Sequence, residues 1–281
     1  RFYSGAVSGA FGAVGRNLPT GLATEGGDPA DTPLLQAILD KKTPEGKPAY
    51  EHGLHSLNDT AEPTALLRNA LTAQQDQNCV VFLDGPATNL AALLALPGAK
   101  GWIERKARLL VVSEGGLAAT PAHRTALAKV FAEWPSPIVF AGADVASAGP
   151  YPAASFEKDF AWSSSHPLVD VHKASGVTGD LAAPSLAGAL HAVREKEQWF
   201  GQSEAGQLTL AADGSVRLEP KAGGRHRRLT FDASKREKLQ ALYVELISAK
   251  PVPRMPRFRS QQNQQQQEQK KDAGSPPAPK K

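Results

Sequence analysis

Three short apolar runs, each bounded by turn residues, constrain the fold of this chain more than any other feature. They are residues 78–83 (NCVVFL), 108–112 (RLLVV) and 137–141 (PIVFA). Segments with helical spacing of apolar residues follow the first two runs, over 90–96 and 121–134. Strands that alternate with helices of this size indicate βαβ units. We therefore predict an α/β fold with an open, mostly parallel sheet and flanking helices.

Two local details accompany the first run. The nearly continuous apolar character of residues 78–83 is typical of a strand that is buried on both faces. Gly85-Pro86 ends this strand, and we expect Thr88 or Asn89 to cap the helix that follows.

The second half of the chain predicts a smaller group of elements. Asp213-Gly214 lies between the apolar runs 207–210 and 216–218, which is a strong signal for a β-hairpin. Helices are expected over 187–193 and, with one apolar face, over 234–249. The hairpin is therefore a small C-terminal addition to the parallel sheet.

Composition changes at residue 251 to Pro, Arg, Gln and Lys. Such a segment cannot bury enough apolar surface to offset its ordering entropy, so we predict a folded domain over 1–250 and a disordered tail over 251–281. Residues 250–281 hold eight Lys/Arg and two Asp/Glu, so the rest of the chain carries −2 although the whole carries +4. We therefore expect no specific nucleic-acid partner.

Composition also excludes several classes of protein. A hydrophobic fraction of 41% excludes a wholly disordered chain. No apolar run approaches the roughly 20 residues of a membrane-spanning helix. The single cysteine, Cys79, excludes an intramolecular disulfide and a Cys-based zinc site. No signal-peptide pattern follows Arg1, so we expect either that a leader has been removed or that the sequence starts inside a longer protein.

The segment 80–92 (VVFLDGPATNLAA) resembles the strand–GPxTN–helix signature of the inosine/uridine-preferring nucleoside hydrolases. The resemblance continues in order through the segments 111–116 (VVSEGG), 131–143 (FAEWPSPIVFAGA), 199–206 (WFGQSEAG) and 224–229 (GRHRRL). It covers roughly residues 1–250 and is greatest for the secreted or periplasmic bacterial branch.

The resemblance implies an activity, a cofactor and a place of action. Members of this family hydrolyse the N-glycosidic bond of ribonucleosides with a bound Ca²⁺, which orients the ribose diol and helps to deprotonate the attacking water. The implied partner is thus a small-molecule nucleoside or related N-glycoside. The resemblance further implies a periplasmic or secreted location and a homo-oligomer.

Two aspartates are the candidate calcium ligands in this chain. Asp84 occupies the position whose backbone carbonyl is a ligand in the family, although an Asp in a turn after a strand is an equal alternative. Asp180 is the candidate for the family's late Asp, although a gapless alignment places Ser185 there. The family's Asp-x-Asp-x-x-x-Asp-Asp cluster does not occur, and residues 1–26 resemble the segment after it. We therefore expect the cluster to lie upstream of Arg1 or to be absent.

The expected substrate contacts are also incomplete. The family's ribose-binding Glu-x-Asn falls on Leu117 and Ala119, and neither side chain can form a hydrogen bond. His52 is the candidate contact to the leaving base, and Asn89 of GPxTN is the second candidate substrate-binding residue. The function implied is that of a Ca²⁺-dependent nucleoside N-ribohydrolase with a partly degenerate site. The alternative is a catalytically inactive binding or structural module of the same fold.

Other polar residues have simpler interpretations. Ligands of open parallel sheets bind at the carboxyl ends of the strands, where Glu114 and Asp144 lie. His123 and His226 are expected to face solvent, and His166, which precedes Pro167, is expected to mark a helix boundary.

Overall fold

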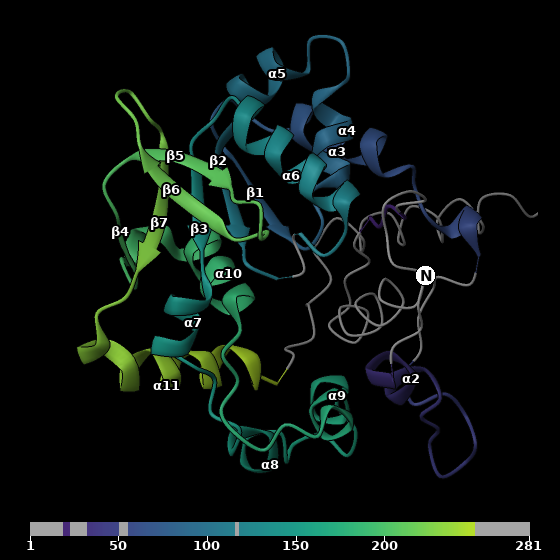
Figure 1. Ribbon diagram of the computed structural model, residues 1–281. Coiled ribbons are helices and arrows are strands. Elements are labelled where there is room, and N and C mark those ends of the chain that lie inside the picture. The colour runs from purple at the N-terminus through teal and green to yellow at the C-terminus, as the bar shows by residue number, and fades with distance from the viewer. Residues whose placement is uncertain (1–18, 23–32, 51–55, 116–117, 251–281) are drawn as a thin grey trace, which may run out of the picture.

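The computed structural model describes residues 19–22, 33–50, 56–115 and 118–250 of the chain. Within them the chain forms a mixed sheet with helices on both faces, as Figure 1 shows. The predicted tail, the candidate contact His52 and the position Leu117 lie outside the described residues.

The described elements follow one another in the order of Figure 1. The strands are β1 (Cys79–Asp84), β2 (Ala107–Ser113), β3 (Ile138–Ala141), β4 (Gly201–Gln202), β5 (Gly206–Leu210), β6 (Val216–Pro220) and β7 (His226–Thr230). The α-helices are α2 (Pro33–Leu39), α3 (Pro63–Thr72), α4 (Thr88–Leu94), α5 (Ala99–Lys106), α6 (Pro121–Glu133), α7 (Ala143–Ala148), α8 (Ser155–Lys158), α9 (Pro167–Ser175), α10 (Pro184–Arg194) and α11 (Arg236–Ile247). Three 3₁₀ turns are η1 (Leu57–Asp59), η2 (Glu195–Glu197) and η3 (Ala233–Lys235).

The sheet has the strand order β1-β2-β3-β7-β5-β6, and β4 pairs with β7 outside this path. The strands β1, β2, β3 and β7 pair in parallel, whereas β5 is antiparallel to both β6 and β7. The predicted α/β class, the mostly parallel sheet and the C-terminal hairpin are all confirmed. No helix of the described segments is long and apolar enough to span a membrane.

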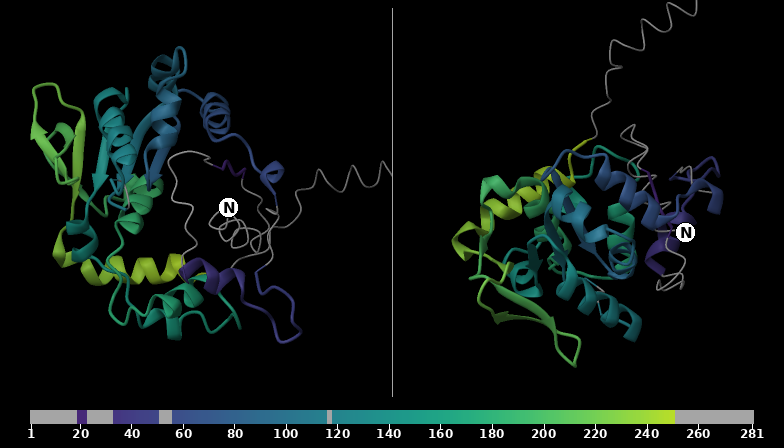
Figure 2. Two further views of the ribbon diagram at one scale, coloured as in Figure 1. Left: turned by 45° about the vertical axis from the view of Figure 1, so that its right-hand side comes forward. Right: turned by 90° about the horizontal axis from the view of Figure 1, so that it is seen from above.

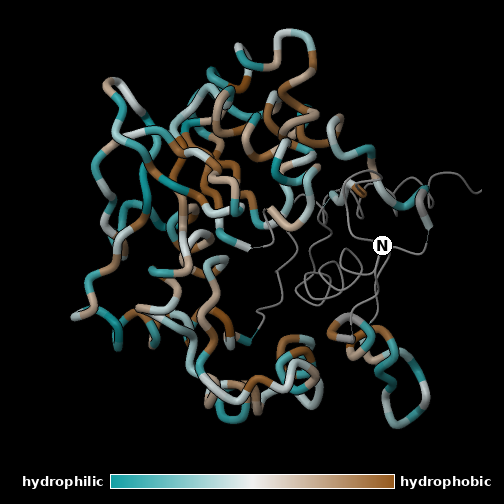
Figure 3. The backbone as a smooth tube through the Cα atoms, viewed as in Figure 1, coloured by the Kyte–Doolittle hydropathy of each residue, from teal (hydrophilic) through white to brown (hydrophobic). Residues whose placement is uncertain are grey.

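Helices cover the two faces of the sheet in separate groups, which Figure 2 shows from two further directions. Leu110 and Val112 of β2 pack with α4, α5 and α6 on one face, and Leu109 and Val111 pack with α7, α10 and α11 on the other. Figure 3 shows apolar residues concentrated in the central strands and the adjoining helices. Each fully buried Leu or Phe contributes about 2 kcal/mol, so both apolar layers are needed for stability.

The burial of β1 differs from the expectation for residues 78–83. All four residues of β3 are buried, but every residue of β1 is half-buried or exposed, and Phe82 retains 37% of its surface. The reason is position in the sheet: β1 has a strand partner on only one side among the described residues. The prediction that this strand is buried on both faces is therefore wrong.

The start of α4 also differs from the expectation. The N-cap residue is Ala87, with no side-chain capping bond, and Thr88 and Asn89 lie within the first turn. Gly85 adopts φ 122°, a conformation that glycine permits, and Ala87 is fully buried beneath the helix. Tertiary burial of Ala87 thus sets the helix start, and the predicted caps are wrong.

Two histidines that were expected to face solvent are buried. His123 is 4% exposed because it lies on the face of α6 that also buries Ala126 and Leu127. His226 is 6% exposed at the start of β7, and its Nδ1 accepts a hydrogen bond from the backbone N–H of Leu208 at 3.1 Å. Its placement follows from the pairing of β7 with β5, which a short sequence pattern does not reveal.

The burial of His226 predicts a pH dependence of folding stability. Burial lowers the pKa of this imidazole to about 4 from an ordinary value of 6.5, and the positive charges of Arg225 and Lys221 lower it further. Below pH 6.5 the unfolded chain takes up a proton that the folded chain excludes, so the contribution of His226 is complete above this pH and declines toward pH 4.

We expect His226→Gln, which retains an acceptor for Leu208 but does not titrate, to weaken this dependence. Between about pH 7 and about pH 5 the free energy of unfolding should fall by about 2 kcal/mol less in the variant than in the parent chain. Denaturant titrations at both pH values measure the difference. An identical fall in both proteins would contradict the assignment.

Candidate functional site

The carboxyl ends of the parallel strands lie together at one edge of the sheet. The register pairs Asp84 of β1 with Ser113 of β2, and Ser113 with Ala141 of β3. The polar side chains that gather there come from these strand ends, from α7, from the start of α10 and from β7. We call the set Asp84, Ser113, Glu114, Asp144, Ser185 and Arg228 the carboxyl-end site.

Asp84 is the centre of the first half of this site. Its Oδ1 accepts a hydrogen bond from Ser185 Oγ at 2.8 Å and a second, short hydrogen bond from Ser113 Oγ. Asp84 is exposed, and Oδ2 has no hydrogen-bond partner among the described residues. Two hydroxyl groups therefore fix the carboxylate while one of its oxygens remains open toward the solvent.

Close packing of α10 on the sheet brings Ser185 to Asp84, from which it is 101 residues distant in sequence. Gly188, one turn further along α10, sits so close to β1 that a Cβ atom there would lie 2.7 Å from Phe82 Cε2. Only glycine permits this approach without displacement of the Phe82 ring. Ser185 thus reaches the site although its spacing in sequence gives no such signal.

The second half of the site surrounds Gly142, the residue between β3 and α7. The Oε2 atom of Glu114 accepts a hydrogen bond from the backbone N–H of Ala143 at 2.6 Å. Arg228 Nη2 lies 3.4 Å from Asp144 Oδ1. A Cβ atom on Gly142 would lie 2.4 Å from Asp144 Oδ1 and 2.7 Å from Arg228 Nη2, so these side chains crowd the same small space.

Arg228 is held in place by neutral groups as well as by Asp144. Its guanidinium lies over the Phe140 ring, 5.1 Å from the centroid, and Nη1 donates to the carbonyl of Val216 at 3.0 Å. A cation over an aromatic face and a carbonyl bond together fix its orientation. The expectation that Glu114 and Asp144 lie at this edge of the sheet is confirmed.

The remaining candidates have different surroundings. Asn89 is half-buried in the first turn of α4, and its side chain forms no hydrogen bond within the described segments. Asp180 lies in the loop before α10, where its Oδ1 accepts a hydrogen bond from the backbone N–H of Ala153 at 3.0 Å. Their assignments as substrate-binding and metal-binding residues stay predictions.

The donors present at the carboxyl-end site do not fit a calcium ion on their own. Ca²⁺ binds about six to eight oxygen atoms, usually with several carboxylates. In the part of the chain that the structure describes, no three His, Cys, Asp or Glu side chains are grouped so as to hold a metal ion. The carboxylates of Asp84 and Asp180 each accept hydrogen bonds from different partners.

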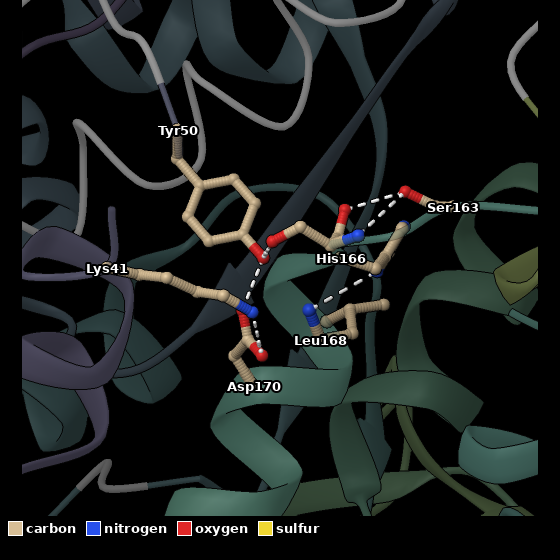
Figure 4. A network of polar contacts seen from close by, with 7 residues as sticks. Lys41, Tyr50, Ser163, His166, Leu168 and Asp170 are labelled. Atoms are coloured by element: carbon tan, nitrogen blue, oxygen red, sulfur yellow. Dashed lines mark hydrogen bonds and ion pairs between the residues drawn. The ribbon is translucent and has the colours of Figure 1, made fainter. Parts of the chain in front are cut away.

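A separate polar network joins the segment after α2 to α9, and Figure 4 shows it from close by. Lys41 Nζ lies 2.6 and 2.7 Å from the two carboxylate oxygens of Asp170, and Tyr50 donates a short hydrogen bond to the same group. The Tyr50 hydroxyl also contacts Ser165 Oγ at 2.9 Å. Burial and the neighbouring Asp170 raise the pKa of Tyr50 above its usual range.

The start of α9 confirms the predicted boundary at His166. His166 is the N-cap residue, and its Nδ1 accepts a hydrogen bond from the backbone N–H of Leu168 at 3.3 Å. Pro167 occupies the first helical position, where a missing N–H costs nothing. The Lys41–Asp170 pair was not anticipated, because 129 residues separate its members.

The fold is similar to that of nucleoside hydrolases of known structure. An inosine-guanosine nucleoside hydrolase aligns over 87% of this chain and 84% of its own, with a TM-score of 0.60 and 12% identity. A purine-preferring ribonucleoside hydrolase from Gardnerella vaginalis aligns over 87% and 85%, with a TM-score of 0.59 and 12% identity. A plant nucleoside hydrolase aligns over 79% and 76%, with a TM-score of 0.56 and 14% identity. No protein-family model and no curated protein sequence matches the chain.

The Lys41–Asp170 pair generates a stability prediction. Only 12% of the Asp170 side chain is exposed, so Lys41→Ala would leave a nearly buried carboxylate without its cation. We expect the variant to lose about 2 kcal/mol of unfolding free energy. The matched control is Lys100→Ala, because Lys100 and its partner Glu133 are exposed and such pairs contribute at most about 1 kcal/mol. Equal losses in both variants, measured by denaturant unfolding, would contradict the prediction.

Proposed function

We propose that this chain binds a ribonucleoside or a related N-glycoside at the carboxyl-end site, with the sugar held by Asp84. The observation that carries the proposal is the exposed carboxylate of Asp84, fixed by Ser113 and Ser185 with one oxygen open. The nucleoside hydrolase fold supports the choice of ligand class. Ligands of open parallel sheets also bind at this edge.

The chemistry of the Asp84 carboxylate suits a sugar. An ionised carboxylate only accepts hydrogen bonds, and the two hydroxyls of a ribose diol are donors that one carboxylate can bind together. Ser113 and Ser185 restrict the rotation of the side chain, so less conformational freedom is lost when a ligand binds. Glu114, Asp144 and Arg228 would then face the part of the ligand nearest to β3.

We further propose that the described residues bind the glycoside without hydrolysing it. Hydrolysis requires water to add to C1′ while the C1′–N bond breaks and the base leaves with the electron pair and a proton. Water activation by a metal needs a donor set that these residues do not supply. Ala119, in place of a ribose-binding Asn, removes a further contact that would orient the sugar.

The second candidate function is Ca²⁺-dependent N-ribohydrolysis. The fold favours it, and so does a carboxylate beside the expected position of the sugar, because negative charge stabilises an oxocarbenium-like transition state. In that case Asp84 and Asp180 would be the ligands that this part of the chain contributes to the ion. The two candidates differ in one measurable property, which is the release of free base.

Binding of inosine and uridine tests the first proposal. We expect Asp84→Asn to weaken binding about tenfold or more, because a charge-assisted hydrogen bond contributes about 1.5–3 kcal/mol. The control is Asp76→Asn, which changes an exposed Asp that pairs with Lys106 instead. Isothermal titration calorimetry measures both variants. Equal affinity of the two, or no binding by the parent chain, would overturn the assignment of the site.

Release of base separates the two functions. With inosine or uridine we expect no hydrolysis above a protein-free control, whether Ca²⁺ or a chelator is present. Chromatography of the reaction mixture detects free hypoxanthine and uracil directly. Release that requires Ca²⁺ and that Asp84→Asn abolishes would establish the second candidate in place of the first.

A further inference from the structure

A second cavity, of about 650 Å³, lies between the end of α10 and the strands β4 and β7. None of the residues that line it belongs to the carboxyl-end site. His191, on its wall, is six residues after Ser185 on α10, which is about 9 Å further along the helix axis. The cavity is thus a separate feature of the same helix, and nothing in the proposed function uses it.

Polar groups with unused hydrogen-bonding capacity line this cavity. His191 is 4% exposed, and its Nε2 meets the Nε2 of Gln202 at 3.5 Å, the outer limit of a hydrogen bond. Burial lowers the pKa of His191, so the ring is neutral near pH 7 and carries one donor and one acceptor. The hydroxyl of Thr230 lies on the same wall. Because buried polar groups are normally well paired, this arrangement indicates that a ligand completes it.

The lower wall of the cavity is aromatic. Phe200 and Phe231 both line it, with ring centroids 5.9 Å apart and planes inclined by 51°. Phe200 is 6% exposed, and Phe231 is half-buried. Such rings offer a surface for stacking a flat ligand, whose edge would then face the polar wall.

The charges around the cavity nearly cancel. Glu195 pairs with Arg108, so its charge is compensated. Asp232 and Lys235 contribute one charge of each sign, and Lys235 Nζ also donates to the carbonyl of Gln198 at 3.3 Å. An uncharged ligand therefore fits this cavity better than a phosphate or a cation does.

From this geometry we propose that the cavity is a second binding site, for a neutral planar heterocycle with a lactam edge, the chemistry of a free nucleobase such as hypoxanthine or uracil. The carboxamide of Gln202 pairs with the adjacent N–H and C=O groups of the lactam, as carboxamides do with base edges. The neutral imidazole of His191 and the hydroxyl of Thr230 bind the remaining edge atoms, and the ring stacks on Phe200 and Phe231.

Titrations of uracil and hypoxanthine, followed by saturation-transfer NMR, test the proposal on the full chain. For ligands this small we expect a dissociation constant on the order of 1 mM. Gln202→Leu should weaken binding about fivefold or more, because it removes the paired donor and acceptor. Its matched control is Gln74→Leu, at an exposed Gln after α3 that lies outside the cavity. Thr230→Val, which changes only a hydroxyl, provides a second variant should Gln202→Leu lower the melting temperature.

Asp84→Asn separates this site from the carboxyl-end site. We expect it to leave the binding of free base unchanged, whether or not Asp84 holds a sugar. Loss of base binding in Asp84→Asn but not in Gln202→Leu and Thr230→Val would place the base at the carboxyl-end site and overturn the proposal. An absence of saturable binding would overturn it too. D-ribose that displaces the base at equal concentration would show a polyol site in place of a nucleobase site.

Discussion

The parallel pairing of β1, β2 and β3 is the constraint on which the rest of the structure depends. Parallel strands require crossover helices, so α4, α5 and α6 cover one face while α7, α10 and α11 cover the other. The same pairing places all the carboxyl ends at one edge. Asp84, Ser113 and Asp144 meet there because of this register and not because they are near in sequence.

The helix α10 connects the two binding features of the chain. Its first turn supplies Ser185 to the carboxylate of Asp84, and its last turns supply His191 to the second cavity. Gly188, between them, allows the helix to approach Phe82 of β1 closely. One rigid element therefore carries a polar contact at each end, and a change in its position would alter both.

The fold could be predicted from the sequence further than the site could. The apolar runs and their spacing gave the strands, the crossover helices and the hairpin, because periodicity and turn residues act locally. Burial was predicted less well: His123 and His226 are in the interior, and β1 is more exposed than its composition implies. Of the site, Asp84, Glu114 and Asp144 could be found as residues after strands. Arg228 and Ser185 reach them only through long-range packing.

By itself, the sequence determined the α/β class, the positions of the strands and the turn at Asp213-Gly214, since each depends on neighbouring residues. Only the tertiary structure decided that Ser185 holds Asp84, that Lys41 pairs with Asp170 and that His191 faces a cavity. The physical reason is that these contacts join residues many positions apart. Their geometry is set by how helices pack on the sheet, and no local pattern encodes that packing.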